Sequence, residues 1–193
     1  YELGYAGYDL SNKLHLINSY KEKLETIDYI IIYFKYKGEL NNNIYSPNTQ
    51  RIAMLSSPLF KIRDNFKLLS YSTKTGVLDP IKNLAIRLTN KNQKATTKQL
   101  NKDRDRELLE NFKSLIDRYG FDKKRYYFLL NSSTVNSEFL DYCHLNEYQI
   151  IDYKEAFEAS SQPTTLIYDQ HWNVNGRDIV ATEIAKKIIE KLY

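Results

Sequence analysis

The sequence predicts an α/β fold in which helices cover both faces of a parallel sheet, giving three layers. Four β-rich runs, near residues 1–5, 29–34, 126–131 and 148–152, alternate with segments of helical periodicity. The runs are apolar at consecutive positions, which is typical of strands buried on both faces. Strands that alternate with helices favour a parallel sheet, because each helix can carry the chain back to the edge where the previous strand began.

The N-terminal segment has the pattern of a strand, a glycine turn and a helix. Gly4 and Gly7 lie at the end of the first run, and Asp9 or Ser11 can cap the helix that follows the turn. The β-branched and aromatic run at 27–34 then has the character of a second buried strand. The segment therefore predicts a βαβ unit.

The middle of the chain has the weakest pattern. We interpret residues 44–100 as an insertion or irregular region within one domain that spans residues 1–193. A helical stripe returns at 103–119, and short helices are expected near 136–142 and 154–158. The second half of the chain therefore continues the alternation of helices and strands.

Length and composition limit the classes of function. The 193 residues include 28 basic and 24 acidic side chains, and the net charge of +4 is too small to indicate nucleic-acid binding. Cys143 is the single cysteine, and His15, His144 and His171 are scattered. We therefore expect no internal disulfide, no metal site and no cofactor. No apolar run approaches the roughly 18 residues that a membrane span needs, so no span is expected.

The most informative stretch precedes the last helix, which is expected at about 174–192. Asp169 and His171 lie two residues apart, so they cannot share a helix face, but in a loop both can face one cleft. A carboxylate that orients an imidazole is the base half of a catalytic triad. Alternatively, Asn173 simply caps the helix while the neighbouring side chains pack the loop. We expect Asn173 to cap the helix and Trp172 to be largely buried as an anchor.

This stretch resembles the last motif of the SGNH (GDSL-like) hydrolases. The pattern D-x-H-W-N-x-x-G before an Ile/Ala-rich helix is nearest the branch of polysaccharide O-acetyltransferases and their esterase relatives. The runs E-L-G-Y-A-G-Y and I-D-Y-I-I-I-Y-F are similar to the second block of the family and to the strand after it. The resemblance implies a flavodoxin-like architecture, with His171 as general base, Asp169 as its orienting acid and Gly7 as a backbone donor to the oxyanion. Taken alone, Gly7 fits a plain strand-to-helix turn better than an oxyanion role, because such glycines are common.

The chain departs from the family at the nucleophile. It contains no Gly-Asp-Ser, and we expect the serine block and the first strand of the domain to precede Tyr1. Ser132 and Ser133 follow a strand and are the substitutes within the chain. The ordinary role of serines at such positions is turn or helix capping.

A second departure concerns the side-chain donor to the oxyanion. The family has an Asn-Asp block after the strand, whereas this chain has Gly38 and Glu39, and an ionised Glu39 would repel an oxyanion. We expect Asn41 to replace the missing side-chain donor to the oxyanion, with Asn42 and Asn43 as alternatives.

Three functions remain open from the sequence. The first is an esterase or O-acyltransferase that acts on a small acyl ester or an acylated carbohydrate, for which the resemblance suggests the cell envelope and an extracytoplasmic location. The second is a catalytically silent SGNH-like domain that binds a glycan or a protein partner. The third is a flavodoxin-like binding module unrelated to hydrolases, in which His171 would not lie at the ligand edge of the sheet.

Overall fold

The computed structural model describes residues 7–47, 97–167 and 171–192, together with the single positions 49, 53 and 58. The chain divides into two compact units, one formed by residues 1–46, 98–166 and 170–193, the other by 47–97 and 167–169. The description that follows concerns the first unit. Most of the predicted irregular region, 44–100, and the strand predicted near 1–5 lie outside the described residues.

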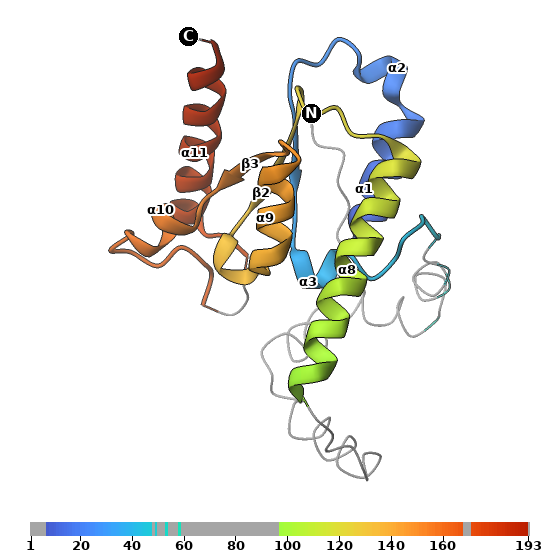
Figure 1. The fold of residues 1–193 in the computed structure, drawn as a ribbon. Coiled ribbons are helices and arrows are strands. Elements are labelled where there is room, and N and C mark those ends of the chain that lie inside the picture. Colours follow the sequence, from blue (N-terminus) through green and yellow to red (C-terminus); the bar gives the residue numbers. More distant parts are fainter. Residues whose placement is uncertain are drawn as a thin grey trace. The chain divides into compact units, whose positions relative to one another are not determined.

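The described part of the chain contains a three-stranded parallel sheet (Figure 1). Its strands are β1 (Ile30–Tyr33), β2 (Tyr126–Leu130) and β3 (Gln149–Asp152), and β2 lies between the other two. Ile30 pairs with Tyr126 at one end of the sheet, and Leu130 pairs with Asp152 at the other. The structure confirms these three predicted strands to within one residue at each end.

Helices follow or precede each strand. They are α1 (Leu10–Ser19), α2 (Lys21–Leu24), α3 (Tyr36–Glu39), α8 (Thr97–Tyr119), the 3₁₀ turn η1 (Ser132–Thr134), α9 (Ser137–Leu145), α10 (Lys154–Glu158) and α11 (Val174–Leu192). The first predicted helix is interrupted at Tyr20, and α8 begins six residues before its predicted start. The helix α3 was not predicted, because four residues are too short to show a periodic pattern. No helix within the described residues is long and apolar enough to cross a membrane.

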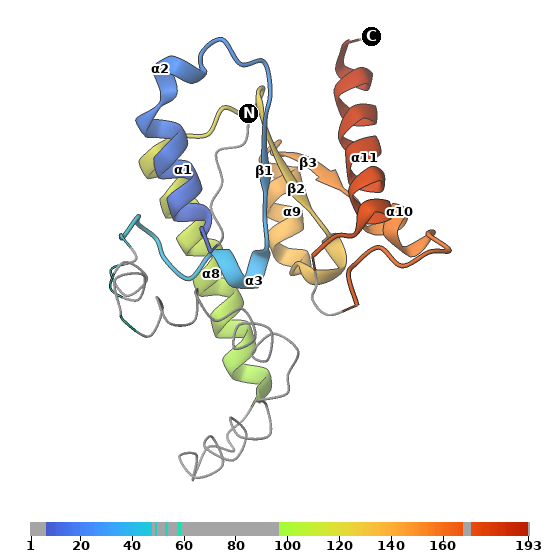
Figure 2. The ribbon, with the colours of Figure 1, turned by 180° about the vertical axis from the view of Figure 1, so that it is seen from behind.

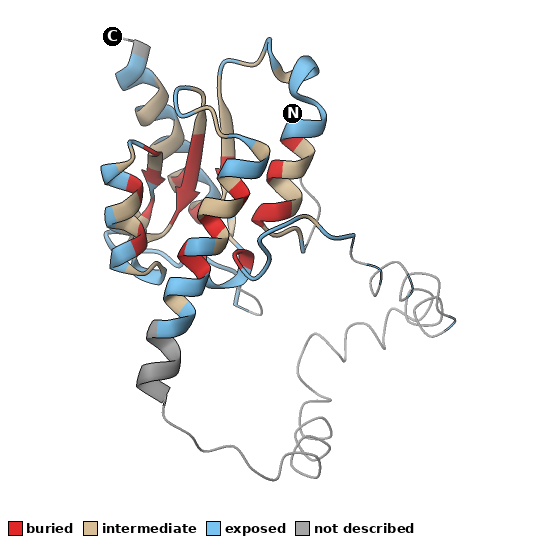
Figure 3. Ribbon diagram, turned by 45° about the vertical axis from the view of Figure 1, so that its right-hand side comes forward, coloured by how far each residue is buried: buried red, intermediate tan, exposed pale blue. Residues whose placement is uncertain are grey.

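The two faces of the sheet bury different sets of side chains, because alternate residues of a strand point to opposite faces. Ile32, Phe128 and Leu130 belong to a cluster with residues from α1, α8 and α9. Tyr127, Leu129 and Ile151 belong to a second cluster with residues from α10 and α11 (Figures 2 and 3). Helices therefore cover both faces, and the described unit is a three-layer α/β structure as predicted.

Candidate functional site at the carboxyl edge of the sheet

Trp172 lies at the carboxyl edge of the sheet, where all three parallel strands end. Its indole packs against the rings of Tyr33, Tyr153 and Phe157, at centroid distances of 5.0, 5.4 and 6.4 Å. Tyr33 is the last residue of β1, and Tyr153 directly follows β3. The indole is mostly buried, as predicted, and its neighbours are aromatic rings at the margin of the sheet. Ligands of parallel α/β sheets bind beyond this edge.

His171 is exposed, and a short antiparallel pairing fixes its backbone. Its carbonyl oxygen accepts a hydrogen bond from the Leu166 amide at 2.9 Å, and the Asn173 amide donates to the Thr164 carbonyl at 3.1 Å. Thr165 and Trp172 form the bridge between these two bonds. Asp169 lies outside the described residues, so its pairing with His171 stays a prediction.

Asn173 caps helix α11, as the sequence predicts. Its side-chain oxygen accepts the Gly176 amide hydrogen at 2.9 Å, which satisfies an N–H group that has no partner inside the helix. Its side-chain nitrogen donates to the Pro163 carbonyl at 2.7 Å. The one residue therefore both starts the helix and holds the preceding segment against it.

Gly7 is exposed and has a φ of +85°, a conformation that L-residues with a side chain rarely adopt. It lies two residues before Asp9, which caps α1 by accepting the Asn12 amide hydrogen at 2.9 Å. Ser11 and Asn42 also donate to this carboxylate, at 2.6 and 2.7 Å. Burial raises the pKa of Asp9, but these hydrogen bonds outweigh burial and hold it below its usual range.

The asparagines after α3 have different surroundings. Asn41 donates to the Gly38 carbonyl at 3.3 Å and accepts from the Arg104 guanidinium at 3.2 Å, so both ends of its amide are in use. Asn42 donates to Asp9 at the start of α1, close in the chain to Gly7. Asn41 as the oxyanion donor stays a prediction, and Asn42 is the asparagine that reaches the start of α1.

Glu39 is buried and forms an ion pair that the sequence did not reveal. The Lys13 ammonium lies 2.6 Å from the Glu39 carboxylate and donates to the Tyr33 carbonyl, also at 2.6 Å. Burial raises the pKa of Glu39, and the Lys13 charge opposes this effect. The sequence offered one hint of this pair, which is that the acidic Glu39 lies beside apolar Leu40. An acid buried next to apolar residues nearly always has a basic partner. The ion pair joins α1 to α3, and the hydrogen bond from Lys13 to Tyr33 joins α1 to the end of β1.

Ser133 belongs to the turn after β2, in which Asn131 caps η1. Its hydroxyl and amide both donate to the Asn131 side-chain oxygen, at 2.6 and 3.0 Å. The Ser132 amide donates to the Asp152 carboxylate at 3.1 Å. These bonds fix the turn after β2 at the same edge of the sheet.

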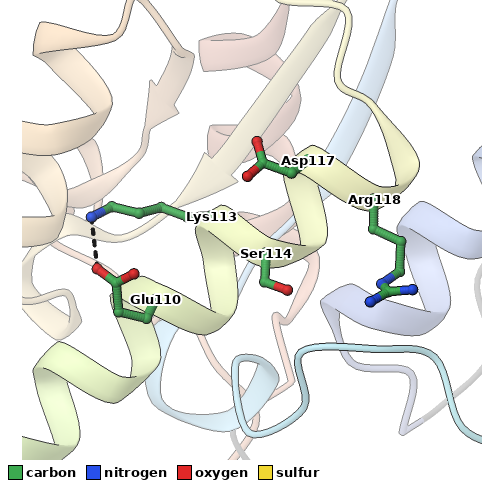
Figure 4. Close-up of a pocket in the computed structure, with 5 residues that line it drawn as sticks. All are labelled: Glu110, Lys113, Ser114, Asp117 and Arg118. Atoms are coloured by element: carbon green, nitrogen blue, oxygen red, sulfur yellow. Dashed lines mark hydrogen bonds and ion pairs between the residues drawn. The ribbon is translucent and has the colours of Figure 1, made fainter.

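Two shallow surface depressions are lined by polar side chains. One, of about 480 Å³, lies along α8 and is lined by Glu110, Lys113, Ser114, Asp117 and Arg118 (Figure 4). The other, of about 510 Å³, lies beside the end of β3 and is lined by Asp152, Glu155, Ala156, Glu183 and Lys186. Ligand pockets are mostly apolar and concave, so neither depression has the character of a small-molecule site. Neither includes Gly7 or His171.

Comparisons with family models, with curated proteins and with solved structures gave no match to this chain. The assignment of a function therefore depends on the residues at the carboxyl edge of the sheet, above all His171 and the Trp172 anchor beside it.

Proposed function

We propose that this chain is an SGNH-type esterase or O-acyltransferase domain, with His171 as its general base and acyl esters, including acylated carbohydrates of the cell envelope, as its substrates. The observation that carries the proposal is the packing of Trp172 on Tyr33 and Tyr153. Because His171 precedes Trp172 in the chain, this contact supports a place for His171 near the edge where α/β sheets bind ligands.

The strand order also supports the proposal. In a flavodoxin-like sheet of order 2-1-3-4-5, the last three strands are adjacent and follow chain order. The described strands have this arrangement, β1-β2-β3. Under the proposal they are the third, fourth and fifth strands of the domain, while the first two contain the serine block and the run near residues 1–5.

The proposed reaction divides the work among groups at this edge. A serine preceding Tyr1 attacks the acyl carbonyl, and His171 accepts the hydroxyl proton as the new C–O bond forms. Asp169 stabilises the imidazolium, and the Gly7 amide donates to the oxyanion. His171 then returns the proton to the departing alcohol, which leaves an acyl-serine. Water or an acceptor hydroxyl, activated by the same imidazole, attacks this ester and releases the acyl group.

A second candidate is a silent SGNH-like domain that binds a glycan or a protein partner. The observation in its favour is the Lys13–Glu39 ion pair, because Glu39 stands in the sequence where the resemblance implies an amide donor. The amide of Asn41 is already engaged with Gly38 and Arg104. A domain with these features has lost one of its two oxyanion donors unless Asn42 replaces it.

Labelling with a fluorophosphonate separates the two candidates, because this reagent modifies only a serine that a base has activated. The natural protein, including the residues that precede Tyr1, should be labelled on a serine in that preceding part, as identified by peptide mass spectrometry. The 193-residue chain alone should show no labelling and negligible turnover of 4-nitrophenyl acetate. Labelling of Ser132 or Ser133 would move the nucleophile into the described chain. An unlabelled natural protein would favour the silent domain.

A further inference from the structure

The first turn of α11 is fastened to residues 160–166, which we call the bracing segment. The Asn175 side-chain nitrogen donates to the Ser160 hydroxyl at 3.0 Å and to the Pro163 carbonyl at 3.2 Å, with the Gln162 carbonyl farther away at 3.4 Å. Asn175 is half-buried. These bonds hold the bracing segment in addition to its pairing with residues 171–173.

Gly176 lets the bracing segment lie against the helix backbone. A Cβ atom at this position would lie 2.0 Å from the Thr164 carbonyl oxygen, 3.0 Å from its carbonyl carbon and 3.3 Å from the Trp172 Cβ. The first two atoms are backbone, so no change of side-chain rotamer relieves the overlap. Any residue other than glycine must therefore move Thr164 away from α11.

A displacement of Thr164 is transmitted to His171 by the antiparallel pairing. The Thr164 carbonyl accepts from the Asn173 amide, and the Leu166 amide donates to the His171 carbonyl. We propose that Asn175 and Gly176 are positioning residues for His171, which hold the imidazole in place through the bracing segment. This inference rests on the proposed function for its catalytic consequence, but its structural part can be measured separately.

Two variants distinguish positioning from a general loss of stability. Gly176→Ala replaces glycine with a better helix former, so helix propensity alone favours the variant and only the overlap with Thr164 opposes it. Asn175→Asp keeps the size of the side chain and places an acid in the first turn of α11, which the helix dipole favours, but the carboxylate cannot donate to Ser160 or Pro163. Ala181→Gly is the control, because Ala181 is exposed on α11 and the change lowers helix propensity without touching the bracing segment.

The experiment measures two quantities on the natural protein and its variants. Amide hydrogen exchange at Leu166 reports the pairing with His171, and kcat and KM for 4-nitrophenyl acetate report catalysis. Gly176→Ala and Asn175→Asp should each speed Leu166 exchange at least about tenfold. They should lower kcat by about 10- to 100-fold with KM nearly unchanged, since a small misplacement of a catalytic group has this effect. Ala181→Gly should leave both quantities close to those of the wild type.

Each outcome bears on one of the two proposals. Wild-type exchange at Leu166 in both folded variants would overturn the positioning role, and so would a loss of kcat without faster exchange. If Gly176→Ala does not fold, Asn175→Asp decides the same question. Faster exchange in a protein whose wild type shows no turnover would contradict the proposed function while leaving the bracing of His171 intact.

Discussion

The indole of Trp172 lies edge-on to the ring of Tyr33, with the two ring planes at 71° and their centroids 5.0 Å apart. This contact joins the loop before the last helix to the last residue of β1, more than 130 residues earlier in the chain. Edge-to-face aromatic pairs add specific attraction to the burial of apolar area. Trp172 therefore fixes the position of a loop that the local sequence alone would leave free to move.

Replacing Trp172 with Ala should reduce the free energy of unfolding by about 2–3 kcal/mol. A fully buried Trp costs roughly 3–5 kcal/mol on truncation to Ala, and this indole is mostly rather than fully buried. Urea unfolding followed by far-UV circular dichroism measures the difference. Trp172→Phe is the control and should retain most of the stability, because a phenyl ring can still contact Tyr33 and Tyr153. A loss below about 0.5 kcal/mol for Trp172→Ala, the range of ordinary surface changes, would contradict the anchoring role.

The Lys13–Glu39 ion pair should show strong energetic coupling. The side chains are 19% and 10% exposed, so removal of either partner leaves a charge in a poorly solvated place. Lys13→Met and Glu39→Met should each cost about 1.5–3 kcal/mol of stability. The double variant should cost less than the sum of the two, with a coupling free energy of about 1–3 kcal/mol. Strictly additive losses in a double-mutant cycle would show that the two side chains do not interact.

Asp9 should make stability depend on pH at the acidic end. Its pKa is held below the usual value of 3.8, so the unfolded state binds the proton more readily than the folded state. The contribution is therefore present above about pH 4 and is lost as the pH falls through the lowered pKa. Asp9→Asn should be less stable than the wild type at neutral pH, and the difference should shrink below about pH 4. A difference that stays constant down to the acid transition would exclude this carboxylate as its source.

The strands could be predicted from the sequence because they are runs of apolar residues that need no knowledge of distant partners. Ile30–Tyr33 and Tyr126–Leu130 are of this kind, and the Asn173 cap is a signal contained within four residues. The α1–α2 break at Tyr20 and the short α3 have no comparable local pattern. The hydrophobic periodicity therefore showed neither the end of α1 at Ser19 nor the presence of α3.

The site was less predictable, because its contacts join distant parts of the chain. Lys13 meets Glu39 only once α1 has packed against β1, and Asn42 rather than Asn41 reaches Asp9 because of the turn after α3. The glycine of the D-x-H-W-N-x-x-G motif could be noted in the sequence. The reason why position 176 needs a glycine is the close approach of the Thr164 carbonyl, and Thr164 lies 12 residues earlier in the chain.

The central claim is that His171 is the general base of an acyl-transfer site. The most direct test compares kcat/KM for 4-nitrophenyl acetate in the natural protein and in His171→Ala, with His144→Ala as control, because His144 is exposed on α9. We predict a loss of at least about 10³-fold for His171→Ala, the scale seen when a triad base is removed, and a change of less than about twofold for His144→Ala. Equal activity of the wild type and His171→Ala would contradict the claim.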